Sequence, residues 1–450
     1  MMKEKNIFNY LVVVLLTLQL VACTRTDAEQ KFNQTPTERL VTQQKELNDL
    51  LLSSEYGWKA IYFTDSTQLG GFTHLFKFLP DGKVDMASDF DTKTAVQSSQ
   101  YEIQLGSTVS LVFTTANRIH LLSDSDSYPS SNLRGKGYLG DFQFLYNRQE
   151  KGDIVFSTNR KVQELRFVKA TAEDWTDLNK SAITLNNMNG DIKSPLFKRL
   201  VTNDGTAEHD FNFDFNSSAR FGIATPLDPT NTESYNFGFS YTPTGAIAKP
   251  ALIVKGQKLT NFLYDSTTNS FVAKGTGNVS ASIKRTNVPP VLTDDYKALL
   301  TATGNKKSTF VYYSETMNTS NKNSGFYKNL FDKANATLPD GKKIRGIWFN
   351  FNTANKKDYI EYEFNGSKQS IKHYITTSED AVNKTIIFKD VSWSVAEKEY
   401  SFLKDLDAEL TNPKGLYCKK EDYIIHLTNY VVFTFTSAAN PLRMTLYKTE

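Results

Sequence analysis

The segment Asp210-Phe211-Asn212-Phe213-Asp214-Phe215 decides the fold class. Three phenylalanines alternate with polar residues, and Tyr235-Asn236-Phe237-Gly238-Phe239-Ser240-Tyr241 repeats the pattern. Because successive side chains of a strand point to opposite faces, strict alternation predicts strands with one buried face and one wet face. Such strands are typical of antiparallel sheets. The centre of the chain is therefore predicted to be antiparallel β-structure.

Strand patterns continue on both sides of this segment. The run Leu75-Phe76-Lys77-Phe78-Leu79 leads through Pro80-Asp81-Gly82 into Val84-Asp85-Met86, which predicts a hairpin. Further strands are predicted at 109–115, 141–147, 153–158, 162–168, 344–352, 358–364, 385–395 and 423–436.

Helices are fewer and are marked by their first turns. Thr35-Pro36-Thr37-Glu38 has the capping-box pattern with proline at the first helical position. A short capped helix is predicted at Thr171, and others at 293–303, 324–335 and 396–410. The predicted fold class is α+β and β-rich, with antiparallel sheets or partly closed barrels and a few packed helices.

Composition excludes several classes of protein. The 450 residues carry 52 Lys+Arg against 49 Asp+Glu, a net charge of +3, which lacks the basic excess of a dedicated nucleic-acid binder. Aromatic residues make up 13% of the chain, enough for a packed core. Two cysteines exclude a disulfide scaffold and a cysteine-rich zinc domain.

The first 22 residues differ from the rest. Lys3 and Lys5 precede an apolar run at 11–20 that is too short to span a bilayer but fits a signal-peptide core. The run ends in Leu20-Val21-Ala22-Cys23, which resembles the bacterial lipoprotein signal box. We therefore predict that residues 1–22 are a lipoprotein signal peptide and that Cys23 carries the lipid anchor. The alternative is an ordinary secretory signal followed by a chance cysteine.

The mature chain is predicted to contain two or three domains. Polar residues 23–34 form a flexible tether. Residues 35–178 form an N-terminal helix plus an antiparallel β domain, and residues 179–288 form a middle β domain. Pro289-Pro290 is the linker, and residues 291–450 form a C-terminal α+β domain.

No catalytic, metal or cofactor site is predicted. The five histidines form no HExxH, and neither a GxSxG nucleophile turn nor a GxxxxGK[ST] phosphate loop occurs. A pair of catalytic carboxylates for glycoside hydrolysis remains an alternative, because the distance between them is set by the fold and not by their spacing in the sequence. The expectation is a protein that is not an enzyme and has no cofactor.

The four tryptophans are the remaining candidates for a binding site. They either form a platform for sugar rings or belong to the core. Trp348 alternates with Ile347 and Phe349, so its side chain faces away from theirs. If that side is exposed, Trp348 is a ligand-binding candidate. If both sides are covered, it belongs to the core.

Several segments together resemble a known family. They are Glu55-Tyr56-Gly57-Trp58-Lys59, Gly70-Gly71-Phe72, Gly140-Asp141-Phe142-Gln143-Phe144, Phe237-Gly238-Phe239-Ser240-Tyr241 and Thr436-Ser437-Ala438-Ala439-Asn440-Pro441. With the signal box, they are similar to the uncharacterised Bacteroidetes lipoprotein family described as domain of unknown function 4302. The resemblance implies a cell-envelope protein encoded near outer-membrane importers of the starch-utilisation type. It supplies no catalytic residue, and only Cys23 carries over as a functional position.

In these bacteria a short Asp-Ser/Thr pattern marks O-glycosylation, and it occurs at Asp65-Ser66-Thr67 and Asp265-Ser266-Thr267. Ser66 and Ser266 are therefore candidate glycan sites. We expect a lipid-anchored outer-membrane protein that binds a ligand for a nutrient importer or assists the importer. Whether the protein is exposed on the cell surface stays open. The alternatives are a structural or assembly lipoprotein and a surface hydrolase. The expected partners are the membrane, the importer and the importer's lipoprotein partner, with no nucleic acid.

Overall fold

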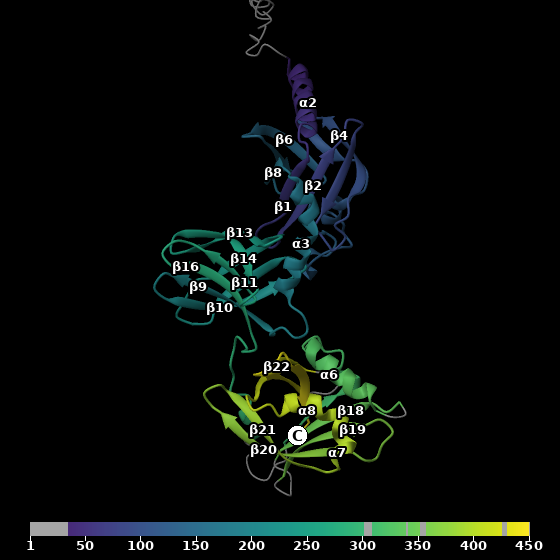
Figure 1. The fold of residues 1–450 in the computed structure, drawn as a ribbon, viewed down its shortest axis with the longest axis vertical. Helices are drawn as coiled ribbons and strands as arrows, with labels where there is room; N and C mark the ends of the chain where they lie inside the picture. The colour runs from purple at the N-terminus through teal and green to yellow at the C-terminus, as the bar shows by residue number, and fades with distance from the viewer. Residues whose placement is uncertain (1–34, 301–307, 339–340, 352–356, 425–429, 450) are drawn as a thin grey trace, which may run out of the picture.

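Three closed β-barrels follow one another along the chain (Figure 1). The computed structural model describes residues 35–300, 308–338, 341–351, 357–424 and 430–449. Each barrel has eight antiparallel strands, every strand pairs with its sequence neighbours, and the first strand pairs with the last. The predicted β-rich, antiparallel fold is confirmed. The barrels are fully closed rather than partly closed, which removes free sheet edges.

The first barrel is closed by pairing of its first strand with its last, with Ala60 opposite Phe167. Phe76 stacks on Phe113 at 5.2 Å and on Phe167 at 4.9 Å between ring centroids, so aromatic rings fill the interior. The strands are β1 Trp58–Phe63, β2 Gly71–Phe78, β3 Lys83–Ser88, β4 Gln97–Leu105, β5 Val109–Phe113, β6 Gln143–Glu150, β7 Asp153–Thr158 and β8 Glu164–Lys169.

The second barrel contains both alternating segments. Phe211, Phe213, Phe237 and Phe239 are buried in its core, as the alternation predicts. The strands are β9 Phe197–Asp204, β10 Glu208–Asn216, β11 Phe221–Pro226, β12 Tyr235–Thr242, β13 Gly245–Val254, β14 Gln257–Asp265, β15 Ser270–Lys274 and β16 Val279–Thr286.

The third barrel contains strands that the sequence patterns missed. The single strand predicted at 423–436 is wrong: two strands, β22 and β23, occupy this region, with residues 425–429 outside the described ranges. The polar strand β20 was not predicted. The strands are β17 Ser308–Tyr313, β18 Ile344–Phe351, β19 Asp358–Phe364, β20 Ile371–Asp380, β21 Thr385–Trp393, β22 Leu416–Ile424, β23 Val431–Ser437 and β24 Arg443–Lys448.

A helix precedes each barrel and adds side chains to its core. Leu47 and Leu51 of α2 (Pro36–Leu52) join the first core, and Met188 of α3 (Ala172–Asn189) joins the second. Leu299 of α4 (Lys297–Leu300) joins the third. The other helices are α5 Ser314–Met317, α6 Gly325–Ala336, α7 Glu397–Tyr400 and α8 Lys404–Leu410, with short 3₁₀ turns at Arg118–Leu122, Ser131–Leu133 and Ser401–Leu403. Within the described ranges, none of the helices has the length and hydropathy needed to cross a bilayer.

Helix α3 is shared by the first two barrels. Its cap is Thr171, as predicted, but the helix has 18 residues and is not short. Near its start, Asp174 forms an ion pair with Lys59 of β1 at 2.6 Å. Further along, Thr184 donates to the carbonyl of Pro243, beside β12 and β13. The predicted boundary after residue 178 therefore falls within α3.

The turn between β10 and β11 enters the end of the first barrel. Ala219 and Phe221 belong to the first barrel's core cluster. Between them, Arg220 donates to the carboxylate of Asp89 at 3.1 Å and to the carbonyl of Gly71 at 2.9 Å. Its guanidinium carbon lies 4.2 Å from the centre of the Phe72 ring. Both charged side chains are about 97% buried, so this ion pair between the two barrels is shielded from bulk solvent.

Gly238 and Ser240, on the face of β12 that was predicted to be wet, are buried. Ser240 lies 3.4 Å from Thr73 of β2, hydroxyl to hydroxyl. A Cβ atom on Gly238 would lie 2.5 Å from the Cα atom of Gly70, closer than backbone atoms tolerate. The wet-face prediction is wrong here because the first barrel, and not solvent, covers this side of the strand.

Candidate ligand-binding face

The predicted site residues that the structure describes lie in three different barrels. Cys23 and the signal peptide lie outside the described residues. Ser66 is half-buried in the turn after β1, where the Asp65 carboxylate accepts from the Thr67 amide at 3.1 Å. Ser266 is exposed in the turn between β14 and β15. Trp348 lies on β18 of the third barrel.

Trp348 faces outward from the third barrel. Ile347 and Phe349 on either side are buried in the core, while Trp348 is half-buried. A Cβ atom on Gly346 would lie 2.7 Å from the indole Nε1 of Trp348. The missing side chain at Gly346 therefore makes room for the indole to bend back over its own strand.

Four tyrosines lie on strands near Trp348, and a fifth, Tyr430, comes just before β23. We call these five tyrosines and Trp348 the outer aromatic face. In the strand register Trp348 lies opposite Val311, and Val311 lies opposite Tyr447. The ring centroids of Tyr447 and Tyr430 are 4.9 Å apart, nearly parallel. All six side chains are at least partly exposed: Tyr313, Trp348, Tyr359, Tyr374, Tyr430 and Tyr447.

Charged side chains lie among these rings. Glu361 is opposite Trp348 in the register, and its carboxylate lies 3.7 Å from the ammonium group of Lys372. That ammonium group is also 4.7 Å from the centre of the Tyr359 ring. The face thus combines partly exposed aromatic rings with one carboxylate and one ammonium group.

A pocket of about 720 Å³ lies in the third barrel, and none of the six residues of the outer aromatic face lines it. Its apolar wall comes from Phe364, Ile371 and Phe402. Ser370 also lines it and donates a hydrogen bond to Glu361, which connects the pocket to the face. This volume lies within the roughly 300–1,000 Å³ range of small-molecule sites.

The other three tryptophans have structural contacts. Trp58 is fully buried and donates to the Leu51 carbonyl at 2.9 Å. Trp175 donates to the Tyr56 carbonyl at 2.8 Å. Trp393 stacks on two other side chains of the third barrel, at 3.9 and 4.3 Å. Trp348 is the tryptophan on the outer aromatic face.

A buried histidine cluster was not visible in the sequence. The Nδ1 atom of His373 lies 3.0 Å from the Asp407 carboxylate, and its Nε2 atom lies 2.7 Å from the Asp390 carboxylate. Tyr362 donates to the same Asp407 carboxylate at 2.7 Å. Burial opposes the charged imidazole, but the two carboxylates outweigh it and raise the pKa of His373 above its usual value. Residues so far apart in the chain have no spacing that would identify them.

Both ring nitrogens of His373 contact carboxylates. No group of three or more His, Cys, Asp or Glu side chains could hold a metal ion in the part of the chain that the structure describes. Cys418 is buried as a free thiol, and burial raises its pKa well above the usual value.

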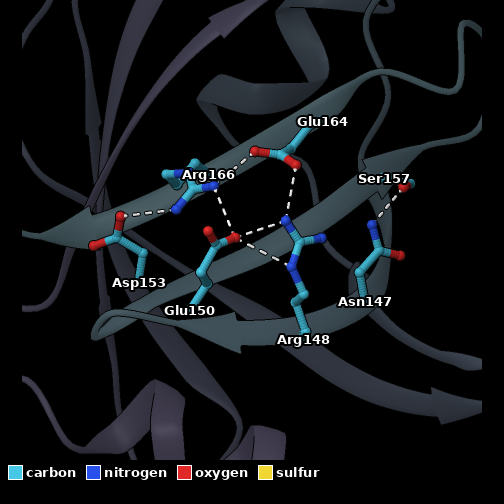
Figure 2. A network of polar contacts seen from close by, with 7 residues as sticks. All are labelled: Asn147, Arg148, Glu150, Asp153, Ser157, Glu164 and Arg166. Atoms are coloured by element: carbon cyan, nitrogen blue, oxygen red, sulfur yellow. Dashed lines mark hydrogen bonds and ion pairs between the residues drawn. The ribbon is translucent and has the colours of Figure 1, made fainter.

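The outer side of β6, β7 and β8 carries a charged network (Figure 2). Arg148 contacts Glu150 at 2.6 Å, and Arg166 contacts Glu164 at 2.9 Å and Asp153 at 3.3 Å. Hydrogen bonds from both arginines hold the pKa of Glu150 below its usual value. Because these charges already satisfy one another, the network favours strand pairing in the first barrel rather than ligand binding.

The fold and the face define a class: a tandem of three β-barrels with partly exposed aromatic side chains on the outer side of its last barrel. The chain belongs to the family described as domain of unknown function (DUF4302), whose model matches residues 28–266, just over half of the chain. The matched region contains the first barrel, the α3 helix and the second barrel through β14, and thus both sides of the Arg220 contact. The third barrel lies outside it.

Comparisons with curated proteins and with solved structures add no relative that bears on function. No curated protein matches the chain. The DNA polymerase sliding clamp from Bacillus subtilis is a solved structure with 11% identity and a TM-score of 0.17, over 92% of this chain and 97% of the clamp. At that TM-score the similarity carries no argument about fold or function.

Proposed function

We propose that this protein is a lipid-anchored cell-envelope protein of the outer membrane that binds a glycan for an importer of the starch-utilisation type. The observation that carries the proposal is the outer aromatic face around Trp348, with Glu361 and Lys372 among its rings. Pyranose rings have apolar faces and hydroxyl edges, and both find partners there. The mechanism is passive binding, with no bond made or broken.

The position of the face along the molecule supports this role. Helix α2, where the described chain begins, lies at one end of the molecule, and the third barrel lies at the other end (Figure 1). An anchor on Cys23 would therefore keep the outer aromatic face far from the attachment point. A tethered binder raises the local concentration of its ligand near a partner on the same membrane.

The anchor and the partner are tested together. We expect the wild-type protein to fractionate with outer membranes and a Cys23→Ser variant to leave them, since the lipid supplies the apolar contact with the bilayer. Gently solubilised wild-type protein should co-purify with a transporter and its lipoprotein partner, identified by mass spectrometry. Wild-type protein recovered alone would contradict the importer role, and membrane association of the Cys23→Ser variant would contradict the anchor.

The ligand is tested by substitution at Trp348. We expect Trp348→Ala to weaken binding to soluble starch or another glycan that the wild type binds by about tenfold or more, because stacked apolar surface is lost. Gly346→Ala should also weaken binding, since the new methyl group displaces the indole. Affinity electrophoresis on glycan gels, with far-UV circular dichroism to verify folding, measures both effects.

The matched control is Trp175→Ala, which removes a half-buried tryptophan from helix α3 and leaves the outer aromatic face intact. Equal affinity of the wild type and the Trp348→Ala variant would contradict the assignment of this face. Absence of binding to any glycan, together with recovery of a transporter, would favour the structural or assembly role instead.

A further inference from the structure

A cavity of about 190 Å³ lies where the linker meets the third barrel. Its floor is the outer side of β22, β23 and β24, including Lys419, Glu421 and Arg443. The linker segment 289–293 forms one wall, and Phe197 at the start of β9 reaches it from the second barrel. Small-molecule sites are common at such domain junctions.

The lining is strongly cationic. Four basic side chains face the cavity against a single carboxylate, Glu421; they are Lys322, Lys384, Lys419 and Arg443. Glu421 is 9% exposed, and its carboxylate lies 3.7 Å from the Lys322 ammonium group. Because a concave site with low-dielectric walls focuses the field of its charges, the excess of positive charge attracts anions.

Neighbouring groups hold the cations in place. The Arg443 Nε donates to the Lys322 carbonyl at 2.6 Å, and its guanidinium carbon lies 6.0 Å from the Phe197 ring centre. Outside the lining, Asp294 contacts Lys384 at 3.0 Å. Lys419 is exposed and extends from the floor strand. The hydroxyl of Thr434 donates to Glu421 at 2.8 Å, which turns that carboxylate toward its own strand neighbours.

We propose that this cavity binds a small oxyanion, a phosphate or a carboxylate, with Lys419, Lys322 and Arg443 as its cationic partners. The cavity of about 190 Å³ has room for an inorganic phosphate or a short carboxylic acid. An anion bound in the cavity contacts the linker, the third barrel and Phe197 of the second barrel. It therefore also stabilises the junction between these two barrels. The site is separate from the outer aromatic face.

Isothermal titration of the full-length protein tests the site with inorganic phosphate, sulfate and citrate, at constant ionic strength balanced by chloride. We expect saturable one-site binding of at least one anion, and an affinity about tenfold weaker in the Lys419→Gln variant, because one charge-assisted hydrogen bond is lost. Binding of phosphate or sulfate alone identifies a tetrahedral anion. Binding of citrate alone identifies a carboxylate.

The control is Lys258→Gln, which removes an exposed charge from the second barrel and should leave the affinity unchanged. A Thr436→Val variant provides a second test, since it keeps the side-chain volume and removes a hydroxyl that lines the cavity. Absence of saturable binding by all three anions would overturn the proposal. So would wild-type affinity in both the Lys419→Gln and the Thr436→Val variants.

Discussion

Replacing Arg220 by Met should destabilise the first two barrels by about 3–5 kcal/mol, the usual effect of removing one partner of a buried ion pair. The change leaves Asp89 buried without its counter-charge. Burial already raises the pKa of Asp89, and Arg220 opposes that rise. Without Arg220 the pKa of the Asp89 carboxyl should rise further. Denaturant unfolding of the full chain measures the loss, and small-angle scattering should show a larger separation of the two barrels.

A double variant separates the charge effect from the loss of packing. Asp89 also accepts from the Thr73 amide at 2.8 Å, so Asp89→Asn keeps an acceptor there and removes the charge. We expect Arg220→Met with Asp89→Asn to recover part of the stability lost in Arg220→Met alone. The matched control is Arg118→Met, whose partner Asp91 is 41% exposed and can be solvated. Equal losses for Arg118→Met and Arg220→Met would contradict the role assigned to the inter-barrel pair.

The second large effect is expected in the third barrel. Replacing Asp407 by Asn should lower stability at pH 6 by about 3 kcal/mol, because the buried carboxylate contacts both His373 and Tyr362. Loss of this contact releases α8 from β19 and β20. Hydrogen exchange measured by mass spectrometry should show faster exchange in these elements and unchanged exchange in the first barrel. Unchanged protection of β19 and β20 would contradict the role of the cluster.

The same cluster makes the third barrel sensitive to pH. His373 has a pKa above that of the unfolded chain, so its contribution to stability is fully present below about pH 6.5 and is lost as pH rises through the folded-state pKa. The groups that face it are Asp390 of β21, Asp407 of α8 and the stacked Trp393 ring. We expect the melting temperature of the third barrel to fall above pH 6.5 in the wild type. In His373→Gln this dependence should be flattened, and a slope equal to that of the wild type would contradict the assignment.

Sequence patterns predicted the elements best where local chemistry decides them. The capping box at Thr35 is present, with the Thr35 side chain accepting from the Glu38 amide. The hairpin through Pro80-Asp81-Gly82 joins β2 and β3. The phenylalanines of β10 and β12 point into the core. The weakly apolar β20 was missed, because its place in the sheet comes from pairing with β19 and β21 rather than from its own hydrophobic pattern.

The candidate site was predictable in part. The alternation around Trp348 correctly indicated an outward side chain, and the structure adds the tyrosines and Glu361 that accompany it. The His373 cluster and the junction cavity were missed, because their members come from strands, helices and a linker that are distant in the chain. Ser66 and Ser266 remain predicted glycan sites.

The sequence by itself determined which residues alternate between core and surface, where α2 and α3 begin, and that familiar catalytic motifs are absent. Only the tertiary structure decided that the strands close into three barrels, that Gly238 and Ser240 pack against the first barrel, and that Arg220 meets Asp89. The physical reason is the distance along the chain over which the deciding interactions act. Alternation and caps depend on neighbours a few residues away, whereas closure and burial depend on which distant surface excludes water from the same side chains.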